Sequence, residues 1–305
     1  MVSLTPESDM ASATPTLDTD PSQKIGSRSA TLFWRIRHNP QMIIGIICIS
    51  IFLIPALFAP WITRRGPAEL DLGTTFAEPS TANYFGTDEM GRDLFSRIVY
   101  GGRVSLQVAG IAVGIGLGVG LSTGLVAGYF GGWVDNIIMR VMDALQAFPA
   151  ILLAIVIAAV LGPGLTNTMI AIGIVSIPRF SRIMRGQVLQ LKEEEFIEAS
   201  RALGAGDVRL IIFHILPNGL APIIVAAAVS SAAAILTEAS LSFVGLGAKP
   251  PTPSWGGMLQ TGYKFLEIAP WLSIYPGLAI AITTLGLNFL GDGLRDVLDP
   301  KLKGR

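Results

Sequence analysis

A long stretch with almost no charge constrains the fold more than any other feature. Between Val104 and Pro178 the sequence holds three charged residues, Asp135, Arg140 and Asp143. Over the whole chain 14% of the residues are charged and 51% are hydrophobic, whereas charged residues make up about 25% of a typical soluble domain. Because a helix of about 20 apolar residues crosses a bilayer, we expect an all-α membrane protein.

The apolar segments predict six transmembrane helices. They cover residues 41–62, 103–128, 141–161, 165–182, 218–243 and 268–290. Basic residues at positions 24, 28, 35 and 37 precede the first helix, and the positive-inside rule therefore places the N-terminus in the cytoplasm. An even number of spans puts the C-terminus on the same side.

These helices divide the chain into regions. The first residues are rich in Ser, Thr, Pro and Asp, a composition typical of disordered segments. We expect a disordered cytoplasmic tail at 1–30, a first transmembrane helix within 31–62, an extracytoplasmic segment at 63–100, a core of five transmembrane helices at 101–292 and a cytoplasmic tail at 293–305. In the extracytoplasmic segment, 92–99 is amphipathic, which fits either a helix on the membrane surface or a helix packed on protein.

Four glycines recur at every fourth position of the second predicted helix, namely Gly116, Gly120, Gly124 and Gly128. Small residues at this spacing let two helix backbones approach closely in lipid. A phosphate-binding loop is excluded, because the glycines lie inside an apolar run and no GxxxxGK[ST] pattern follows. We therefore expect this stripe to be a helix-packing face.

A charged insert separates the fourth and fifth predicted helices. Residues 179–209 contain six basic and five acidic residues, too many for a segment that lies in lipid. Apolar residues at helical spacing indicate a short helix that Gly204 or Gly206 ends. Asp207 is expected to cap a second helix, and Pro217 to break it from the fifth span. This projecting hairpin could dock a cytoplasmic partner or only cap the bundle.

The insert "EASRALGAGDVRLIIFHILPN" resembles the EAA signature of ABC importer permeases. Two further segments, "NYFGTDEMGRDLFSRIVYGGRVSL" and "EASLSFVGLGAKPPTPSWGGML", resemble the dipeptide/oligopeptide/nickel group of these permeases, and within it the dipeptide permease C type. The matching positions in the insert are Glu198, Ala199, Gly204, Leu216 and Pro217, with Ser200 in place of the second alanine.

The resemblance implies a type I ABC importer permease fold in the inner membrane of a bacterium. The partners it implies are a homologous second permease, two cytoplasmic ATPases that bind ATP and Mg²⁺, and an extracytoplasmic peptide-binding protein. Residues 183–217 would be the coupling loop, in which Glu198 anchors the helix to the ATPase and Leu203 and Ala205 contact it. The substrate implied is a di- or oligopeptide, with nickel chelates, glutathione and haem as alternatives.

Other residues offer little for chemistry. The single cysteine and two histidines leave no catalytic residue and no metal site to predict, and the balanced charge gives no sign of a nucleic-acid partner. We expect no enzymatic activity and no cofactor bound by this chain. Glu238 lies near an apolar interior, where it could serve as a gate or as an anchor at the outer interface. A self-contained secondary transporter that uses Asp135, Asp143 and Glu238 as an ion path is the alternative function.

Overall fold

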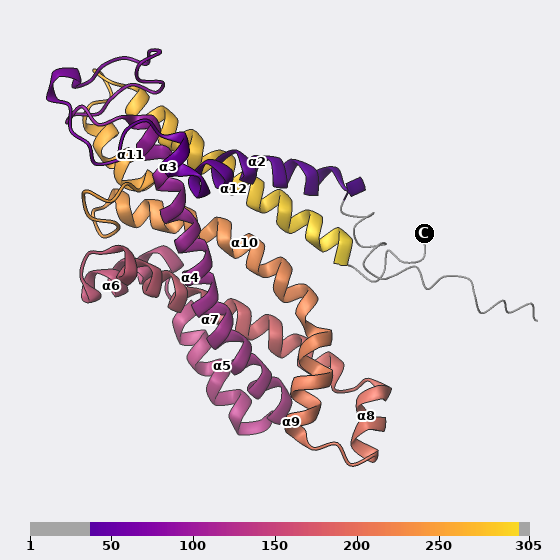
Figure 1. Cartoon of the computed structure of the whole chain (residues 1–305). Coiled ribbons are helices and arrows are strands. Elements are labelled where there is room, and N and C mark those ends of the chain that lie inside the picture. Colours follow the sequence, from indigo (N-terminus) through magenta and orange to yellow (C-terminus); the bar gives the residue numbers. More distant parts are fainter. Residues whose placement is uncertain (1–36, 299–305) are drawn as a thin grey trace, which may run out of the picture.

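The structure, a computed structural model, describes residues 37–298 (Figure 1). Within this range the regular secondary structure is helical, apart from an isolated bridge between Thr87 and Asp93, and loops join the helices. The predicted disordered tail at 1–30 lies outside the described residues. The start of the predicted C-terminal tail is helical, because the last helix continues to Leu298.

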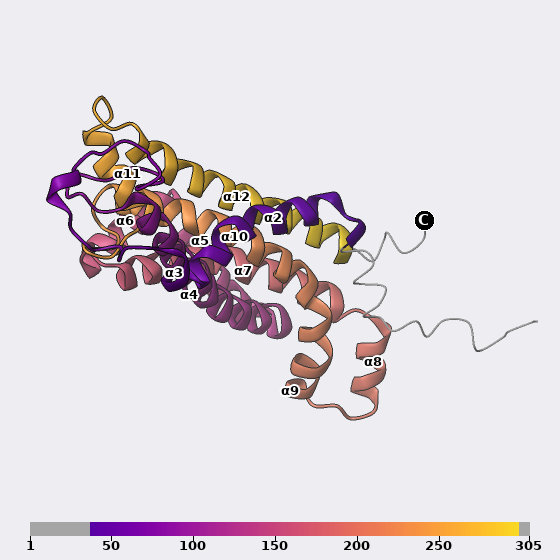
Figure 2. The ribbon, with the colours of Figure 1, turned by 45° about the horizontal axis from the view of Figure 1, so that its top comes forward.

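Five long helices form the body of the molecule: α2 Pro40–Leu57, α4 Leu94–Phe130, α7 Leu165–Leu191, α10 Leu216–Phe243 and α12 Trp271–Leu298. The shorter elements are α3 Ala59–Ile62, η1 Leu72–Thr74, α5 Gly132–Gln146, α6 Ala150–Leu161, α8 Glu195–Ala202, α9 Asp207–Arg209, η2 Leu210–Ile215 and α11 Trp255–Lys264. Helix α10 packs against α12 on one side and against the α4–α7 pair on the other (Figures 1 and 2). Helix α2 packs on α12.

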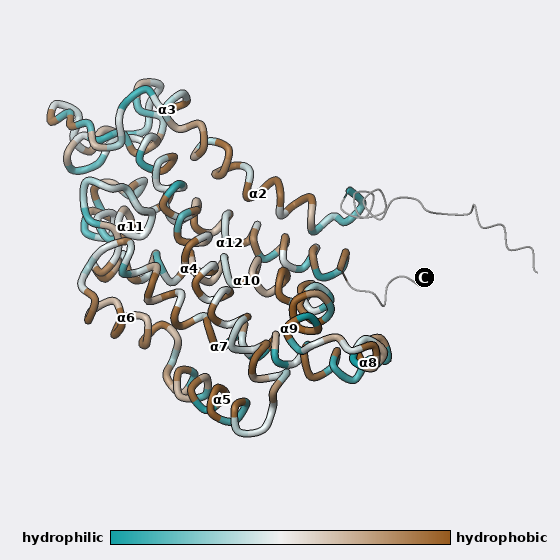
Figure 3. The backbone as a smooth tube through the Cα atoms, turned by 60° about the horizontal axis from the view of Figure 1, so that its bottom comes forward, coloured by the Kyte–Doolittle hydropathy of each residue, from teal (hydrophilic) through white to brown (hydrophobic). Residues whose placement is uncertain are grey.

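Four helices of the described chain are long and apolar enough to cross a membrane. These are α2, α4, the continuous helix Asp207–Phe243 and α12. The hydropathy along the tube shows apolar stretches over α2 and α6 and hydrophilic ones at α8 (Figure 3). Since α7 has 27 residues, it is also long enough, but arginines in its second half lower its hydropathy.

The third predicted span differs from the structure. Instead of one helix over 141–161, the chain forms α5 and α6, which meet at 89°. Pro149 lies at the break, and a proline disfavours the helical conformation of the residue before it. The pair counts as a fifth span only if the two bent halves cross the membrane together.

The glycine stripe packs α4 against α7, as the sequence predicts. All four glycines are buried. A Cβ atom on Gly120 would lie 2.7 Å from the carbonyl oxygen of Ile177, and one on Gly124 would lie 2.4 Å from that of Ser181. The two backbones are therefore too close for any larger side chain at these positions.

The amphipathic stretch before the second span is the start of α4 itself. Asp93 caps the helix by accepting a 2.8 Å hydrogen bond from the Ser96 backbone N–H. Leu94 and Ile98 on one face and Arg97 on the other are all buried. The helix packed on protein is thus the correct interpretation, and the membrane-surface helix is wrong for these residues.

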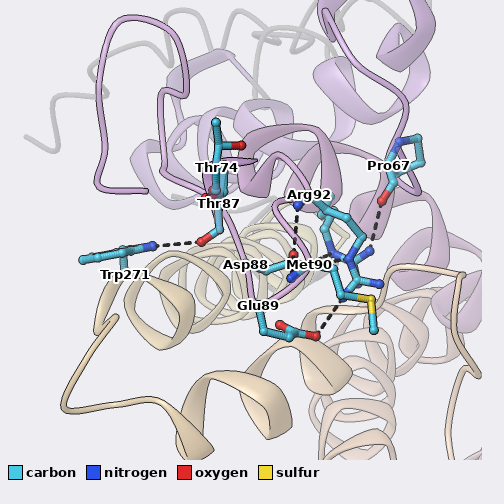
Figure 4. Close-up of polar contacts among 9 residues, drawn as sticks. Pro67, Thr74, Thr87, Asp88, Glu89, Met90, Arg92 and Trp271 are labelled. Carbon is cyan, nitrogen blue, oxygen red and sulfur yellow. Dashed lines mark hydrogen bonds and ion pairs between the residues drawn. The ribbon is translucent and has the colours of Figure 1, made fainter. Parts of the chain in front are cut away.

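The segment 63–93 folds over one end of the bundle, opposite the end that carries α8 (Figures 1 and 2). A buried ion cluster holds it: Asp88 pairs with Arg92 at 2.6 Å and with Arg97 at 3.5 Å, and Arg97 donates to the Pro67 carbonyl at 3.0 Å (Figure 4). The Trp271 indole N–H of α12 donates to the Thr87 carbonyl at 3.3 Å. These contacts tie the segment to the ends of α4 and α12.

Candidate coupling loop

The charged insert forms a compact hairpin at the end of α7 (Figure 2). Helix α8 follows α7 after a short turn and presents Ile197, which is fully buried, to the rest of the chain. Ile197 belongs to the main hydrophobic core together with Leu210 and Ile215 of η2. One face of α8 is therefore fixed to the membrane helices, while the other faces outward.

Gly204 forms the turn that ends α8. Its φ of +85° lies in the left-handed region that favours glycine. The Gly204 N–H donates to the Arg201 carbonyl at 2.9 Å and the Ala205 N–H to the Ser200 carbonyl at 3.1 Å, the paired bonds of a Schellman motif. Gly206 has φ −72°. Of the two glycines that the sequence offered, Gly204 is thus the one that the turn requires.

The second helix of the hairpin corrects two predictions. The N-cap is Gly206, and the carboxylate of Asp207 instead accepts a 2.5 Å hydrogen bond from the Tyr129 hydroxyl at the end of α4. Pro217 does not break the helix, which runs on into α10. The π-helical turn η2 directly precedes α10 and shifts the register of the backbone hydrogen bonds. Pro217, which has no backbone N–H, is therefore accommodated in the first turn of α10.

The outward face of the loop combines apolar and charged side chains. Leu203 is 89% exposed, and Val208 and Phe213 are each 69% exposed. Glu198 and Ala199 are also exposed, and the Glu198 carboxylate has no partner among the residues that the structure describes. Large apolar side chains gathered on an exposed hairpin indicate a surface that another protein covers.

The predicted coupling residues fall into three groups by position. Glu198, Ala199 and Leu203 lie on the exposed face, whereas Ser200 is half-buried and donates from its hydroxyl to the Phe196 carbonyl at 2.7 Å. Gly204 and Ala205 form the turn, and Pro217 lies beyond η2 in the first turn of α10. Ser200, Leu203, Gly204 and Ala205 also line a hollow between α8 and η2.

Two ion pairs connect α5 to α7, the helix that leads into the loop. Arg185 binds Asp135 through two hydrogen bonds of 2.5 Å, and Arg182 binds Asp143 at 2.6 Å. Asp143 is thus held by a residue of another helix, because Arg182 reaches it from α7. Together with the Tyr129–Asp207 bond, these pairs link α4, α5, α7 and the loop.

Tyr129 and Arg185 are residues that the sequence did not single out. Their partners are distant along the chain, 78 residues away for Tyr129 and 50 for Arg185. The one signal present was the acidic residue Asp135 in an otherwise apolar region, since a charge there needs a partner.

Glu238 lies in α10 and is 1% exposed. The Ser242 hydroxyl, one turn later, donates to its carboxylate at 2.5 Å. Such burial favours a role inside the protein over an exposed anchor.

Residues 120–304 match the family model described as "Binding-protein-dependent transport system inner membrane component". The chain belongs to this family. The matched range includes the last part of α4, the whole hairpin and α12, so the family region contains the hairpin as well as the helices that it joins.

Relatives of this chain cover nearly its whole length. It is 49% identical over 271 residues to a dipeptide transport system permease protein, DppC, of Alkalihalophilus pseudofirmus, with 89% of each chain covered. It is 45% identical over 274 residues to a glutathione transport system permease protein, GsiD, of Escherichia coli, covering 89% of this chain and 90% of the relative. A putative peptide transport system permease protein of Brucella abortus is 44% identical over 269 residues, covering 88% and 90%.

A solved structure is similar to this chain in fold. A chain of the MetNI methionine ABC transporter, in an inward-facing conformation, matches with a TM-score of 0.53 and 21% identity. The match covers 65% of this chain and 95% of that chain. The two chains therefore share their arrangement of helices over nearly the whole of the solved chain.

Proposed function

We propose that this chain is the permease subunit of an ATP-driven importer and forms half of the translocation pathway for di- or oligopeptides. Its family and its relatives support this function, because the relatives are permease proteins for dipeptides, peptides or glutathione. Glutathione is itself a peptide, so all three cargoes share amide bonds and free carboxylates. Nickel chelates and haem are the alternative cargoes of the same architecture.

The proposed topology has six transmembrane helices in the inner membrane of a bacterium, with both termini in the cytoplasm. The spans would be α2, α4, the bent pair α5–α6, α7, α10 and α12. Basic residues before α2 support a cytoplasmic N-terminus. This topology places the coupling loop in the cytoplasm and the segment 63–93 outside.

The partners in this proposal are a homologous second permease, two ATPases that bind ATP and Mg²⁺, and an extracytoplasmic peptide-binding protein. The chain itself would bind no cofactor and carry no ATPase site, so it would act as a transport subunit and not as an enzyme. ATP-driven motion would have to enter it through the exposed hairpin. The single observation that carries this proposal is the hairpin's construction: an exposed apolar and charged face on a helix whose other face is fully buried.

In the proposed mechanism α8 sits in a groove of an ATPase. Glu198 would form charge-assisted hydrogen bonds there, and Leu203 would bury its exposed side chain. A displacement of α8 would pass directly into α7 and α10, because the hairpin is continuous with both helices. The pathway would then switch between two orientations whose balance the ATPases change. We also propose Glu238 as a residue of the gate.

The alternative of a self-contained secondary transporter is not favoured by the geometry of its proposed ion path. Asp135 and Asp143 are each held by an arginine of α7. A carboxylate that is already paired with a guanidinium is a poor carrier of a proton or a cation. The chain would also have to transport without an ATPase.

Co-purification of the ATPases with the assembled complex tests the proposal. We expect Glu198→Lys to reduce the ATPase recovered with the complex and to lower peptide uptake in proteoliposomes. Glu267→Lys is the matched control, because Glu267 is also exposed but lies in the loop between α11 and α12. Full recovery and full uptake with Glu198→Lys would show that the hairpin is not the docking site, and uptake by this chain alone would refute the subunit function.

A further inference from the structure

A groove lined by polar and apolar residues runs between α7, α10 and α12. It is a hollow of about 720 Å³, a size that accommodates a small organic ligand. The polar residues that line it are Arg179, Gln187 and Gln190 of α7, Asn218 of α10, and Asp292 and Arg295 of α12. The rest of its lining is apolar, so a few polar groups converge on a mostly hydrophobic surface, as they do in ligand sites.

Helix α7 presents three different faces, and the groove uses one of them. One face packs on the glycine stripe of α4, and a second carries Arg182 and Arg185, which are paired with acids of α5. The third face carries Arg179, Gln187 and Gln190 at helical spacing. Two of the three arginines are thus accounted for by partners within the chain, and the third is not.

Arg179 lies at the middle of α7, 14 residues after Leu165 and 12 before Leu191. This position is near the inner end of the predicted span 165–182 and begins the charged insert 179–209, so Arg179 lies where α7 leaves the lipid. It is exposed, and its guanidinium has no hydrogen-bond or ion-pair partner among the residues that the structure describes. A charged side chain without a partner in the described chain faces water or a group of another molecule, because facing lipid is unfavourable for a charge.

We infer that this groove is a transit site for small peptides and that Arg179 binds the peptide carboxylate. A guanidinium presents two parallel N–H donors that match the two oxygens of a carboxylate. Asp292 lines the same hollow and supplies an opposite charge for the peptide ammonium group. A zwitterionic peptide thus satisfies charges of both signs in the groove. This inference rests on the proposed function, since it assumes that peptides are the cargo.

Photolabelling of the assembled complex tests the inference without the binding protein. The probe is a dipeptide that contains benzoylphenylalanine, compared with its C-terminal amide, on the complex in lipid nanodiscs. For the native complex we expect the free acid to label α7 and α10 about tenfold more than the amide, the change that loss of one charge-assisted hydrogen bond produces. Arg179→Gln should abolish this preference, and Arg179→Lys should keep only part of it, because an ammonium group retains the charge but not the two parallel donors.

Arg182→Gln is the matched control. This variant removes a guanidinium from the same helix, but that guanidinium pairs with Asp143 and does not line the groove. The preference for the free acid should therefore remain. An unchanged preference in Arg179→Gln would overturn the inference. So would loss of the second permease from the Arg179→Gln complex, because Arg179 would then pair with that subunit.

Peptide uptake by the native complex separates this inference from the proposed function. If the native complex hydrolyses ATP but imports no peptide, the proposed cargo is wrong. If it imports peptide while labelling ignores Arg179, the cargo stands and only the transit site is wrong.

Discussion

At the scale of single residues, Gly204 and Gly206 show how one backbone angle distinguishes two similar positions. Both are exposed, and a Cβ atom would meet no other atom at either of them. They differ in φ, which is +85° at Gly204 and −72° at Gly206. Only Gly204 therefore needs to be glycine for conformational reasons.

We expect Gly204→Ala to strain the turn by about 1–2 kcal/mol, because the left-handed conformation brings Cβ close to the following carbonyl. The orientation of α8 should change while the membrane helices remain folded. ATPase recovery with the complex should fall, whereas the yield of the permease pair should not. Gly206→Ala should retain nearly native recovery, and equal losses in both variants would contradict a specific role of the Gly204 turn.

Glu238 allows a prediction that separates folding from gating. Glu238→Gln keeps the size of the side chain and can still accept the hydrogen bond from Ser242. If the carboxylate serves the gate, the thermal midpoint of the complex should change little while uptake falls several-fold. Ser242→Ala is the companion variant, since it removes the donor and keeps the carboxyl group. Native uptake in Glu238→Gln would reduce Glu238 to a packing role.

At the scale of elements, the contact between α4 and α7 depends on the absence of side chains. The glycine stripe lets the two backbones come within the distance that a methyl group would occupy. Since lipid gives helices little hydrophobic reason to associate, close packing of small residues supplies much of their attraction.

We expect Gly124→Ala to destabilise this helix pair by about 1–3 kcal/mol, the usual cost of overpacking. The new methyl group would lie 2.4 Å from a backbone oxygen of α7, so the helices would have to separate. Gly118→Ala on the same helix is the control, because no atom lies within 4 Å of its added Cβ. Thermal unfolding of the purified complex should distinguish the two, and equal midpoints would contradict the packing argument.

At the scale of the whole molecule, the two ends of the bundle carry different structures. One end holds the charged hairpin, and the other holds the segment 63–93 with its buried ion cluster (Figures 1 and 4). In the proposed topology the first meets the ATPases and the second lies on the side of the binding protein. The long helices between them connect the two ends.

Asp88 lies at the centre of the ion cluster and is 3% exposed. We expect Asp88→Asn to cost about 3–5 kcal/mol locally, because the buried guanidinium of Arg97 loses the carboxylate that it pairs with, whereas Arg92 keeps its 2.9 Å pair with Glu89. Limited proteolysis should then cut within 63–93. Basal ATP hydrolysis should persist, while its stimulation by the loaded binding protein should fall. Asp71→Asn is the control, since the Asp71–Arg65 pair is partly exposed.

Local patterns in the sequence determined the helical class, the glycine packing face and the hairpin with a glycine at its turn, because each depends on residues close together in the chain. The tertiary structure decided which side chains of other helices hold the hairpin and the helix that leads into it. The Tyr129–Asp207 and Asp135–Arg185 bonds, the Arg182 partner of Asp143 and the groove around Arg179 all join helices distant in sequence. A charge in an apolar run signals that a partner must exist, but only the packing of the helices determines which residue that partner is.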